Sequence, residues 1–176
     1  MVTMSDIRYP IGQFEYEGLA SAEQCAARLL VFRNHPGELR AAVKGLSESQ
    51  LDTPHRDGGW TVRQIVHHLG DANIHFYCRT KATVTEEKAL IVGFEEDDWI
   101  KTPDITIDVE ATLSLLDGLH RRWDAIMSAM KHADYARTFT HNENGETVLD
   151  RQLAYAAWHC QHHVAQIIGA RNRYGW

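Results

Sequence analysis

The 176-residue chain lacks the run of roughly 20 apolar residues that a membrane-spanning helix needs. Its first residues, M-V-T-M-S-D-I-R-Y-P, lack a basic segment followed by an apolar one, so we expect no signal peptide. The net charge is −6 and no block of Lys or Arg is present, which argues against nucleic-acid binding. Three distant cysteines, Cys25, Cys78 and Cys160, do not predict a disulfide framework, and a reducing cytoplasm is the expected compartment.

Several signatures of catalytic sites are missing as well. The zinc-protease motif H-E-x-x-H needs a glutamate directly after its first histidine, whereas His159 is followed by Cys160. No histidine has a glutamate three residues before it, which excludes a ferritin-type di-iron site. The chain also contains no C-x-x-C-H, no G-x-S-x-G and no glycine-rich phosphate loop.

Apolar residues three or four positions apart predict four long helices. We expect these helices over approximately residues 21–45, 61–83, 108–130 and 148–172. Four helices of similar length predict an all-α four-helix bundle, forming one domain over residues 1–176. Strand signals are weak, with a brief alternation at 105–109, and the acidic segment 95–104 predicts a long crossover between the two middle helices.

The beginnings of the first two helices carry recognisable capping sequences. Ser21 with Gln24, and Thr61 with Gln64, fit the pattern in which the first side chain caps the helix and the second reaches back to it. Pro36 lies inside the first predicted helix. Because proline removes a backbone donor and crowds the preceding turn, we expect it to kink or split that helix.

Three of the eleven histidines crowd into the fourth helix, in the stretch A-W-H-C-Q-H-H at residues 157–163. A turn of about 100° per residue places the core face of that helix on Leu149, Leu153, Ala156, Cys160, Val164, Ile167 and Ile168. His159 and His163 fall together on one flank of this face, one turn apart. His162 points away from it, so we expect that side chain in solvent.

The second helix shows a similar arrangement. Its core face consists of Ile65, Leu69, Ala72 and Phe76. His68 lies on the flank of that face, close in angle to His75, whereas His67 is expected to point into solvent. Asp71 lies three residues from His68 and further towards solvent.

These positions predict a metal site, because neutral imidazole is the commonest ligand of transition metals in proteins. Two ligands four residues apart and a third on a facing helix leave positions open for water or substrate, which is typical of catalytic metal sites. The alternative is a set of partly buried histidines that hydrogen-bond at the rim of the bundle. Cys160 is disfavoured as a nucleophile beside His159, because it lies among apolar residues.

The segment L-D-T-P-H-R-D-G-G-W-T-V-R-Q-I-V-H-H-L-G-D-A-N at residues 51–73 resembles the second-helix motif of DinB-like proteins of the YfiT-type branch. Y-P-I-G, L-H-R-R-W, W-H-C-Q-H-H and the final G-W fit the same branch. The resemblance implies a DinB-like four-helix bundle in which His68, His159 and His163 hold one divalent ion, zinc first and nickel second. It also implies a cytoplasmic homodimer. The branch often has serine and a further histidine where this chain has Cys160 and Gln161.

The expected function is that of a metal-dependent hydrolase acting on a small molecule, with metal-bound water as the nucleophile. Asp71, His75 or His67 are candidates for orienting that water or for accepting its proton. One alternative is a metal-dependent S-transferase that uses a low-molecular-weight thiol such as bacillithiol, mycothiol or glutathione. The other is a non-catalytic metal-binding bundle, in which His75 or an acidic side chain would close the fourth position.

Overall fold

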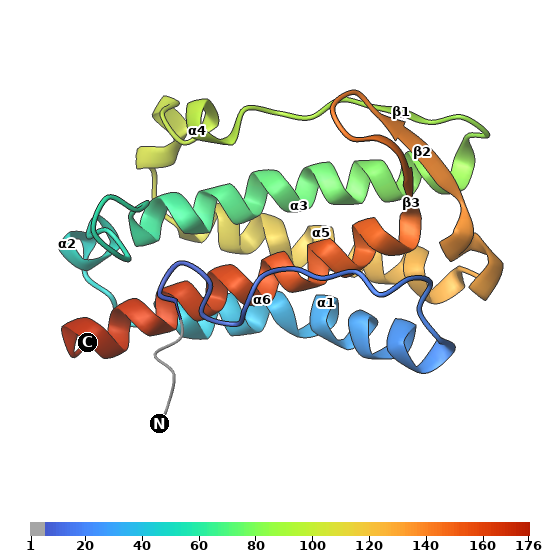
Figure 1. Cartoon of the computed structure of the whole chain (residues 1–176). Helices are drawn as coiled ribbons and strands as arrows, with labels where there is room; N and C mark the ends of the chain where they lie inside the picture. Colours follow the sequence, from blue (N-terminus) through green and yellow to red (C-terminus); the bar gives the residue numbers. More distant parts are fainter. Residues whose placement is uncertain (1–5) are drawn as a thin grey trace.

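Four long helices packed side by side form the body of the protein (Figure 1). The structure, a computed structural model, describes residues 6–176; residues 1–5, part of the stretch in which no signal peptide is expected, lie outside the described residues. The long helices are α1 (Ala22–Val43), α3 (Val62–Thr85), α5 (Glu110–Ala129) and α6 (Leu149–Tyr174). The predicted all-α four-helix bundle is confirmed, and the assignment of residues 1–176 to one domain stays a prediction.

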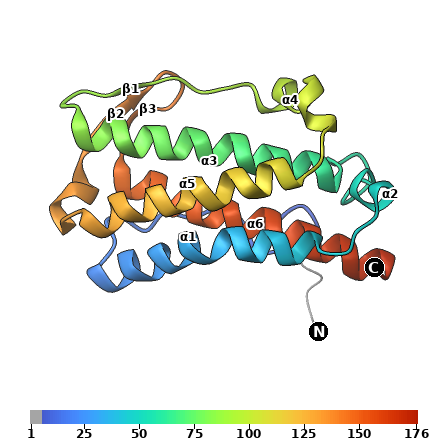
Figure 2. The same ribbon diagram turned by 180° about the vertical axis from the view of Figure 1, so that it is seen from behind.

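The order of packing in the bundle depends on a long crossover. α1 contacts α5 and α6, and α3 contacts the same two helices. α3 and α5 run in the same direction (Figures 1 and 2), so the chain between them must return along the whole bundle. It does so through residues 86–109, which contain the short helices α4 (Glu96–Trp99) and η1 (Pro103–Thr106). The crossover predicted from the acidic segment is therefore confirmed.

Side-chain caps fix where two of the long helices begin. The hydroxyl of Ser21 accepts from the backbone N–H of Gln24, and the Gln24 side chain accepts from the Ser21 N–H. Thr61 and Gln64 make the same reciprocal pair at the start of α3. Both predicted capping boxes are confirmed, and each satisfies two backbone donors that a helix start would leave without partners.

The predicted split of the first helix at Pro36 was wrong, because α1 runs unbroken through it. A proline at this position leaves the carbonyl of Phe32, four residues earlier, without its usual helical donor. The ring of His120 on α5 replaces that donor, because its Nδ1 lies 2.7 Å from the Phe32 oxygen. A side chain from a neighbouring helix therefore compensates for the proline, which the sequence of α1 alone does not reveal.

A small sheet lies at one end of the bundle. β1 (Leu90–Ile91) pairs in parallel with β2 (Thr138–His141), and β2 pairs antiparallel with β3 (Gly145–Val148). These strands are too short to show a clear alternation in sequence. The weak strand signal at 105–109 was wrong, because residues 103–106 form the 3₁₀ helix η1 instead.

Turns and short helices complete the chain. Residues 142–145 form the turn of the β2–β3 hairpin, in which Gly145 has a φ of +69° that favours glycine. The other short elements are α2 (Glu48–Leu51) and the 3₁₀ helix η2 (His132–Ala136).

Residues 6–20, which precede α1, form an extended segment that lies along α6 (Figure 1). Three side chains of α6 hold this N-terminal segment. The buried carboxylate of Asp150 accepts from the Tyr16 hydroxyl and pairs with Arg28, Trp158 Nε1 donates to the Gly12 carbonyl, and Gln166 Nε2 donates to the Arg8 carbonyl. One side of α6 is therefore covered by a layer that helical periodicity does not predict.

Within residues 6–176, none of the helices combines the length and apolarity that crossing a membrane requires.

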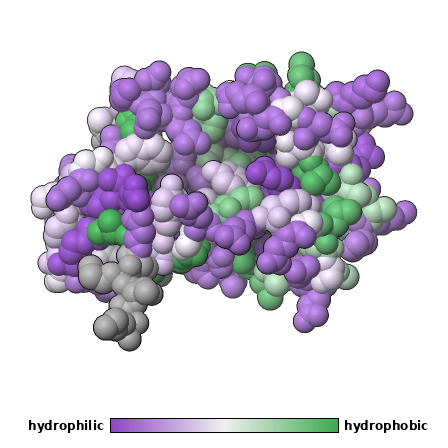
Figure 3. Space-filling view, in the orientation of Figure 1, coloured by the Kyte–Doolittle hydropathy of each residue, from purple (hydrophilic) through white to green (hydrophobic). Residues whose placement is uncertain are grey.

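Ile168, expected in the core of α6, is 45% exposed, so that assignment was wrong. On the face shown in Figure 3, hydrophobic residues lie in small separated areas among hydrophilic ones.

Candidate metal centre

Three histidines from two helices converge in the interior of the bundle. His68 on α3 places its Nε2 atom 3.1 Å from Nε2 of His159 on α6. Nε2 of His163, one turn further along α6, lies 3.2 Å from the same His159 atom. Nitrogen ligands about 2.0–2.1 Å from a single ion would be separated by about this distance. Among the described residues, these three form a group whose ligand atoms all lie within 4.8 Å of one another.

Gln166 fixes the proton on the His163 ring. The Gln166 amide nitrogen donates to the Arg8 carbonyl at 3.1 Å and to Nε2 of His162 at 2.9 Å. Its oxygen must therefore face His163, where it accepts from Nδ1–H at 2.8 Å. With the proton on Nδ1, Nε2 of His163 presents a lone pair to the centre, as a metal ligand must.

The surroundings of the three rings keep them uncharged. Burial lowers the pKa of His68 to about 4. Burial first, and then the neighbouring histidines, lowers the pKa of His159 and His163 well below the ordinary value of histidine. Protonated imidazoles would repel one another at these distances. The donor set is thus three neutral imidazoles at neutral pH, and it fits a divalent transition-metal ion.

Aromatic side chains enclose the three rings. The Trp60 ring lies 4.7 Å from His68 and is stacked at 6.2 Å on His163, measured between centroids. Trp60 comes from the turn D-G-G-W at 57–60, where a Cβ on Gly59 would lie 2.6 Å from the His55 ring. This close approach explains why glycine is needed immediately before Trp60.

Comparison with known proteins places this arrangement in a family. The DinB superfamily profile matches residues 32–167, the span that contains all three converging histidines. The chain belongs to the DinB superfamily. The resemblance identified from its sequence motifs is therefore confirmed.

Relatives within the DinB superfamily match the chain over nearly its full length. A protein of Bacillus mycoides (strain KBAB4) named "Putative metal-dependent hydrolase" is 42% identical, covering 98% of this chain and 100% of its own. A protein of Bacillus cereus (strain B4264) with the same description is 41% identical over the same shares. YfiT from Bacillus subtilis, described as a probable metal-dependent hydrolase with an unusual four-helix bundle topology, superposes with a TM-score of 0.93 at 38% identity. That match covers 97% of this chain and 98% of YfiT.

Two further histidines of this DinB-superfamily chain lie elsewhere than predicted. His67 and His162, expected in solvent, are only 5% and 6% exposed. Nδ1 of His67 lies 2.7 Å from the Thr112 hydroxyl, because the end of the crossover and the start of α5 cover that side of α3. The N-terminal segment covers His162, whose ring stacks on Trp158 at 4.6 Å. Both predictions were wrong for the same reason, because a helical wheel takes no account of other segments that pack on the helix.

Two of the candidates for proton transfer, Asp71 and His75, do not join the three-histidine cluster. Asp71 is half-buried, and burial followed by the charge of Asp104 raises its pKa to about 6. The His75 ring stacks on Phe94 at 4.3 Å and meets Trp99 edge-on at 5.3 Å. His75 therefore belongs to an aromatic layer beneath the crossover.

Cys160 is inert packing, as its sequence position indicated. The side chain is fully buried, and its Sγ lies 3.4 Å from the Asn73 side-chain oxygen. Burial raises the pKa of the thiol to about 12, the opposite of what a nucleophilic cysteine needs.

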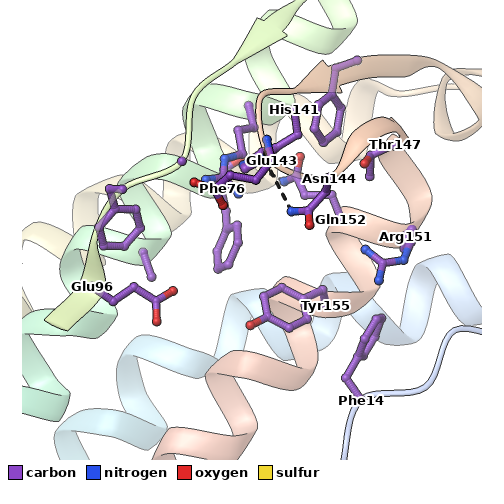
Figure 4. Close-up of a pocket in the computed structure, with 15 residues that line it drawn as sticks. Phe14, Phe76, Glu96, His141, Glu143, Asn144, Thr147, Arg151, Gln152 and Tyr155 are labelled. Carbon is purple, nitrogen blue, oxygen red and sulfur yellow. Dashed lines mark hydrogen bonds between the residues drawn. The ribbon is translucent and has the colours of Figure 1, made fainter.

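A cavity of about 270 Å³ (Figure 4) is lined in part by Phe76 and Tyr155, which contact the ring of His159. Its lining does not include the histidines themselves, but the rings of Phe76 and Tyr155 lie 5.6 and 5.7 Å from the ring of His159. Figure 4 shows the Glu96 carboxylate and the Tyr155 hydroxyl pointing towards one another across it. Burial, and then the Glu96 charge, raises the pKa of Tyr155, which keeps its hydroxyl protonated. The cavity offers room for a small molecule beside the centre.

The sequence did not single out Gln166 or the cavity residues. Gln166 follows His163 by three positions and His162 by four, so the spacing could have suggested that it supports them. The cavity brings together the N-terminal segment, α3, α4, the hairpin and α6. Segments so far apart in the chain leave no local pattern that would reveal the cavity.

Proposed function

We propose that the protein is a metal-dependent hydrolase of small molecules in which His68, His159 and His163 hold one divalent ion, zinc first and nickel second. The observation that carries this proposal is the convergence of their three Nε2 atoms. When bound, such an ion polarises a substrate oxygen and lowers the pKa of a coordinated water to about 7. The names of the DinB-superfamily relatives support the same activity.

The residues around the centre have distinct tasks in this proposal. His68, His159 and His163 remain neutral and keep their lone pairs directed at one point. Gln166 holds the His163 ring by accepting from its Nδ1–H. Trp60 and Phe76 exclude bulk water from two sides, which strengthens electrostatic interactions within the site. Substrate would enter from the adjoining cavity.

An open coordination position distinguishes an enzyme from a closed metal-binding bundle. Within residues 6–176, no fourth histidine, cysteine or carboxylate has a ligand atom within 4.8 Å of the ligand atoms of all three histidines. His75, the residue that would have closed the site, is held in the stack with Phe94. This arrangement favours catalysis over storage of the ion.

Asp71 is the best of the three candidates for accepting a proton, since His67 is already held by the Thr112 hydroxyl. A general base works best when its pKa lies near the working pH, and burial raises the pKa of Asp71 to about 6. His75 packs between aromatic rings, so reorienting it would cost these contacts. Asp71, three residues after His68 on α3, is therefore the preferred candidate for proton transfer.

Metal analysis of protein purified without a histidine tag tests the proposal. We expect about one divalent ion per chain in the wild type and its loss in both His159→Ala and His163→Ala, measured by mass spectrometry. His132→Ala, at an exposed histidine outside the cluster, should keep the ion. A wild type that takes up neither zinc nor nickel would refute the metal centre.

A substrate screen then separates hydrolysis from thiol transfer. Esters and amides are offered to the loaded protein with and without bacillithiol, mycothiol or glutathione. A hydrolase turns over without any thiol. Turnover that requires a thiol would replace the hydrolase with the S-transferase, and the expected homodimer can be checked on the same samples by light scattering.

A further inference from the structure

Two residues that line the cavity each carry a buried polar atom that has no partner within residues 6–176. These atoms are Nε of Arg79 and the side-chain oxygen of Gln152. Arg79 belongs to α3 and Gln152 to α6, and the two residues flank Phe76, since Arg79 stacks over its ring and Gln152 bonds its carbonyl. Buried polar atoms are normally satisfied, so two orphans on residues that line one cavity need an explanation.

The orientation of the Gln152 amide is determined by its partners. Its nitrogen donates to the Phe76 carbonyl at 3.1 Å and to the Thr80 hydroxyl at 3.4 Å. The Thr80 hydroxyl already donates to the Phe76 carbonyl, so it can only accept from Gln152. The Gln152 oxygen is thus a fixed acceptor without a donor, and Gln152 is only 4% exposed.

Arg79 is a positively charged donor that complements the acceptor oxygen of Gln152. None of the ion pairs within the described residues includes it, although Glu96 and Glu143 also line the cavity. Partial burial lowers the pKa of this guanidinium, and the charges of Glu143 and Glu96 counteract that effect from a distance. A buried guanidinium nitrogen without an acceptor is costly, and an anion would satisfy it.

We propose that this cavity binds the substrate of the proposed hydrolase as a small organic anion: its acidic group pairs with Arg79, and an N–H or O–H group donates to the Gln152 oxygen. This inference rests on the proposed function only in calling the ligand a substrate. Carboxylates and phosphonates share the chemistry that a guanidinium recognises. The aromatic rings of Phe14, Phe76 and Tyr155 suit an apolar or aromatic remainder of the molecule.

Hippurate (N-benzoylglycine) is a suitable probe, because it combines a ring, an amide N–H and a carboxylate. Calorimetric titration compares it with the neutral hippuramide, with benzoyloxyacetate, which lacks the N–H, and with the phosphonate analogue of hippurate. Metal-loaded and chelator-treated protein are titrated in parallel, so that direct binding of carboxylate to the ion is separated from binding in the cavity.

We expect hippurate to bind at least about tenfold more tightly than hippuramide, because a charged hydrogen bond replaces a neutral one. Benzoyloxyacetate should bind several-fold more weakly than hippurate. The preference should disappear in Arg79→Gln and be partly kept in Arg79→Lys. The net charge of −6 makes a preference for anions unexpected without a specific cation.

Arg122→Gln is the matched control, since Arg122 stacks over the Tyr77 ring as Arg79 does over Phe76 but lies outside the cavity. It should keep the preference for hippurate. Equal affinity for hippurate and hippuramide, no binding of either, or a preference that survives in Arg79→Gln would overturn the proposal.

The two proposals fail separately in this experiment. A wild type that binds the ion but shows no preference for anions keeps the metal centre and refutes the anion site. If the protein takes up no metal and shows no turnover, but still prefers hippurate to hippuramide in a manner that depends on Arg79, the anion site is supported and the hydrolase is refuted.

Discussion

Two groups of buried histidines in this bundle differ in how their ring nitrogens are arranged. His68, His159 and His163 bring three Nε2 atoms together beside a cavity. His35 on α1 and His120 on α5 lie with ring centroids 5.3 Å apart, and His120 packs against Phe32 and Trp123. Burial lowers the pKa in both groups, so a depressed pKa does not distinguish a site from a core.

The difference lies in where the nitrogen atoms point. His120 donates through Nδ1 to the carbonyl that Pro36 leaves free, so its role is accounted for by the helix it supports. Both ring nitrogens of His35 are buried without partners among residues 6–176. Convergence of lone pairs, rather than burial, therefore marks the candidate metal centre.

The largest expected effect is a loss of metal binding when a histidine of the three-histidine cluster is replaced, but not when His35 is replaced. His68→Ala should weaken metal binding by more than about 100-fold, beyond the loss usual for a supporting partner, and should reduce turnover to background. His35→Leu should keep about one ion per chain. Both variants are checked by metal analysis and turnover, and equal metal loss in the two would erase the distinction between the groups.

The second prediction concerns acid. Burial lowers the pKa of His35 to about 3 and that of His120 to about 4, whereas an unfolded histidine titrates near 6.5. Below pH 6.5, His35 and His120 bind protons in the unfolded chain but stay neutral in the native protein. They therefore destabilise the fold increasingly as the pH falls towards 4. Each contributes a slope of about 1.4 kcal/mol per pH unit in that window.

His35→Leu removes one of these groups together with its two orphan nitrogens. Urea unfolding between pH 7 and pH 4.5 should show a shallower loss of stability in the variant than in the wild type. His132→Ala, at an exposed position, is the control and should follow the wild type. An unchanged slope in His35→Leu would show that His35 is not held neutral in the core.

The smallest expected effect tests the support of the metal centre. Gln166→Ala leaves His163 Nδ1 without its acceptor and should weaken metal binding by about 10- to 100-fold. Gln166→Glu keeps the acceptor and should recover part of the affinity. Gln152→Ala removes another buried glutamine of α6 and should leave metal affinity unchanged; competition with a chelating dye measures all three.

Four helices and the capping boxes at Ser21 and Thr61 could be predicted from the sequence alone, as could the positions of His68, His159 and His163 on the flanks of buried helix faces. These features depend on helical periodicity, which acts between residues three or four apart and is therefore written locally in the chain. The crossover was also predictable, because its acidic composition differs from that of the helices around it.

The surroundings of those residues depend on tertiary packing and could not be predicted from the sequence. His67 and His162 are buried by coils that pack on their helices, and Pro36 is tolerated because His120 comes from another helix. The tautomer of His163 and the cavity with Arg79 likewise require segments distant in the chain. Such contacts depend on how the helices and coils pack in space, and a periodic pattern along one helix carries no information about them.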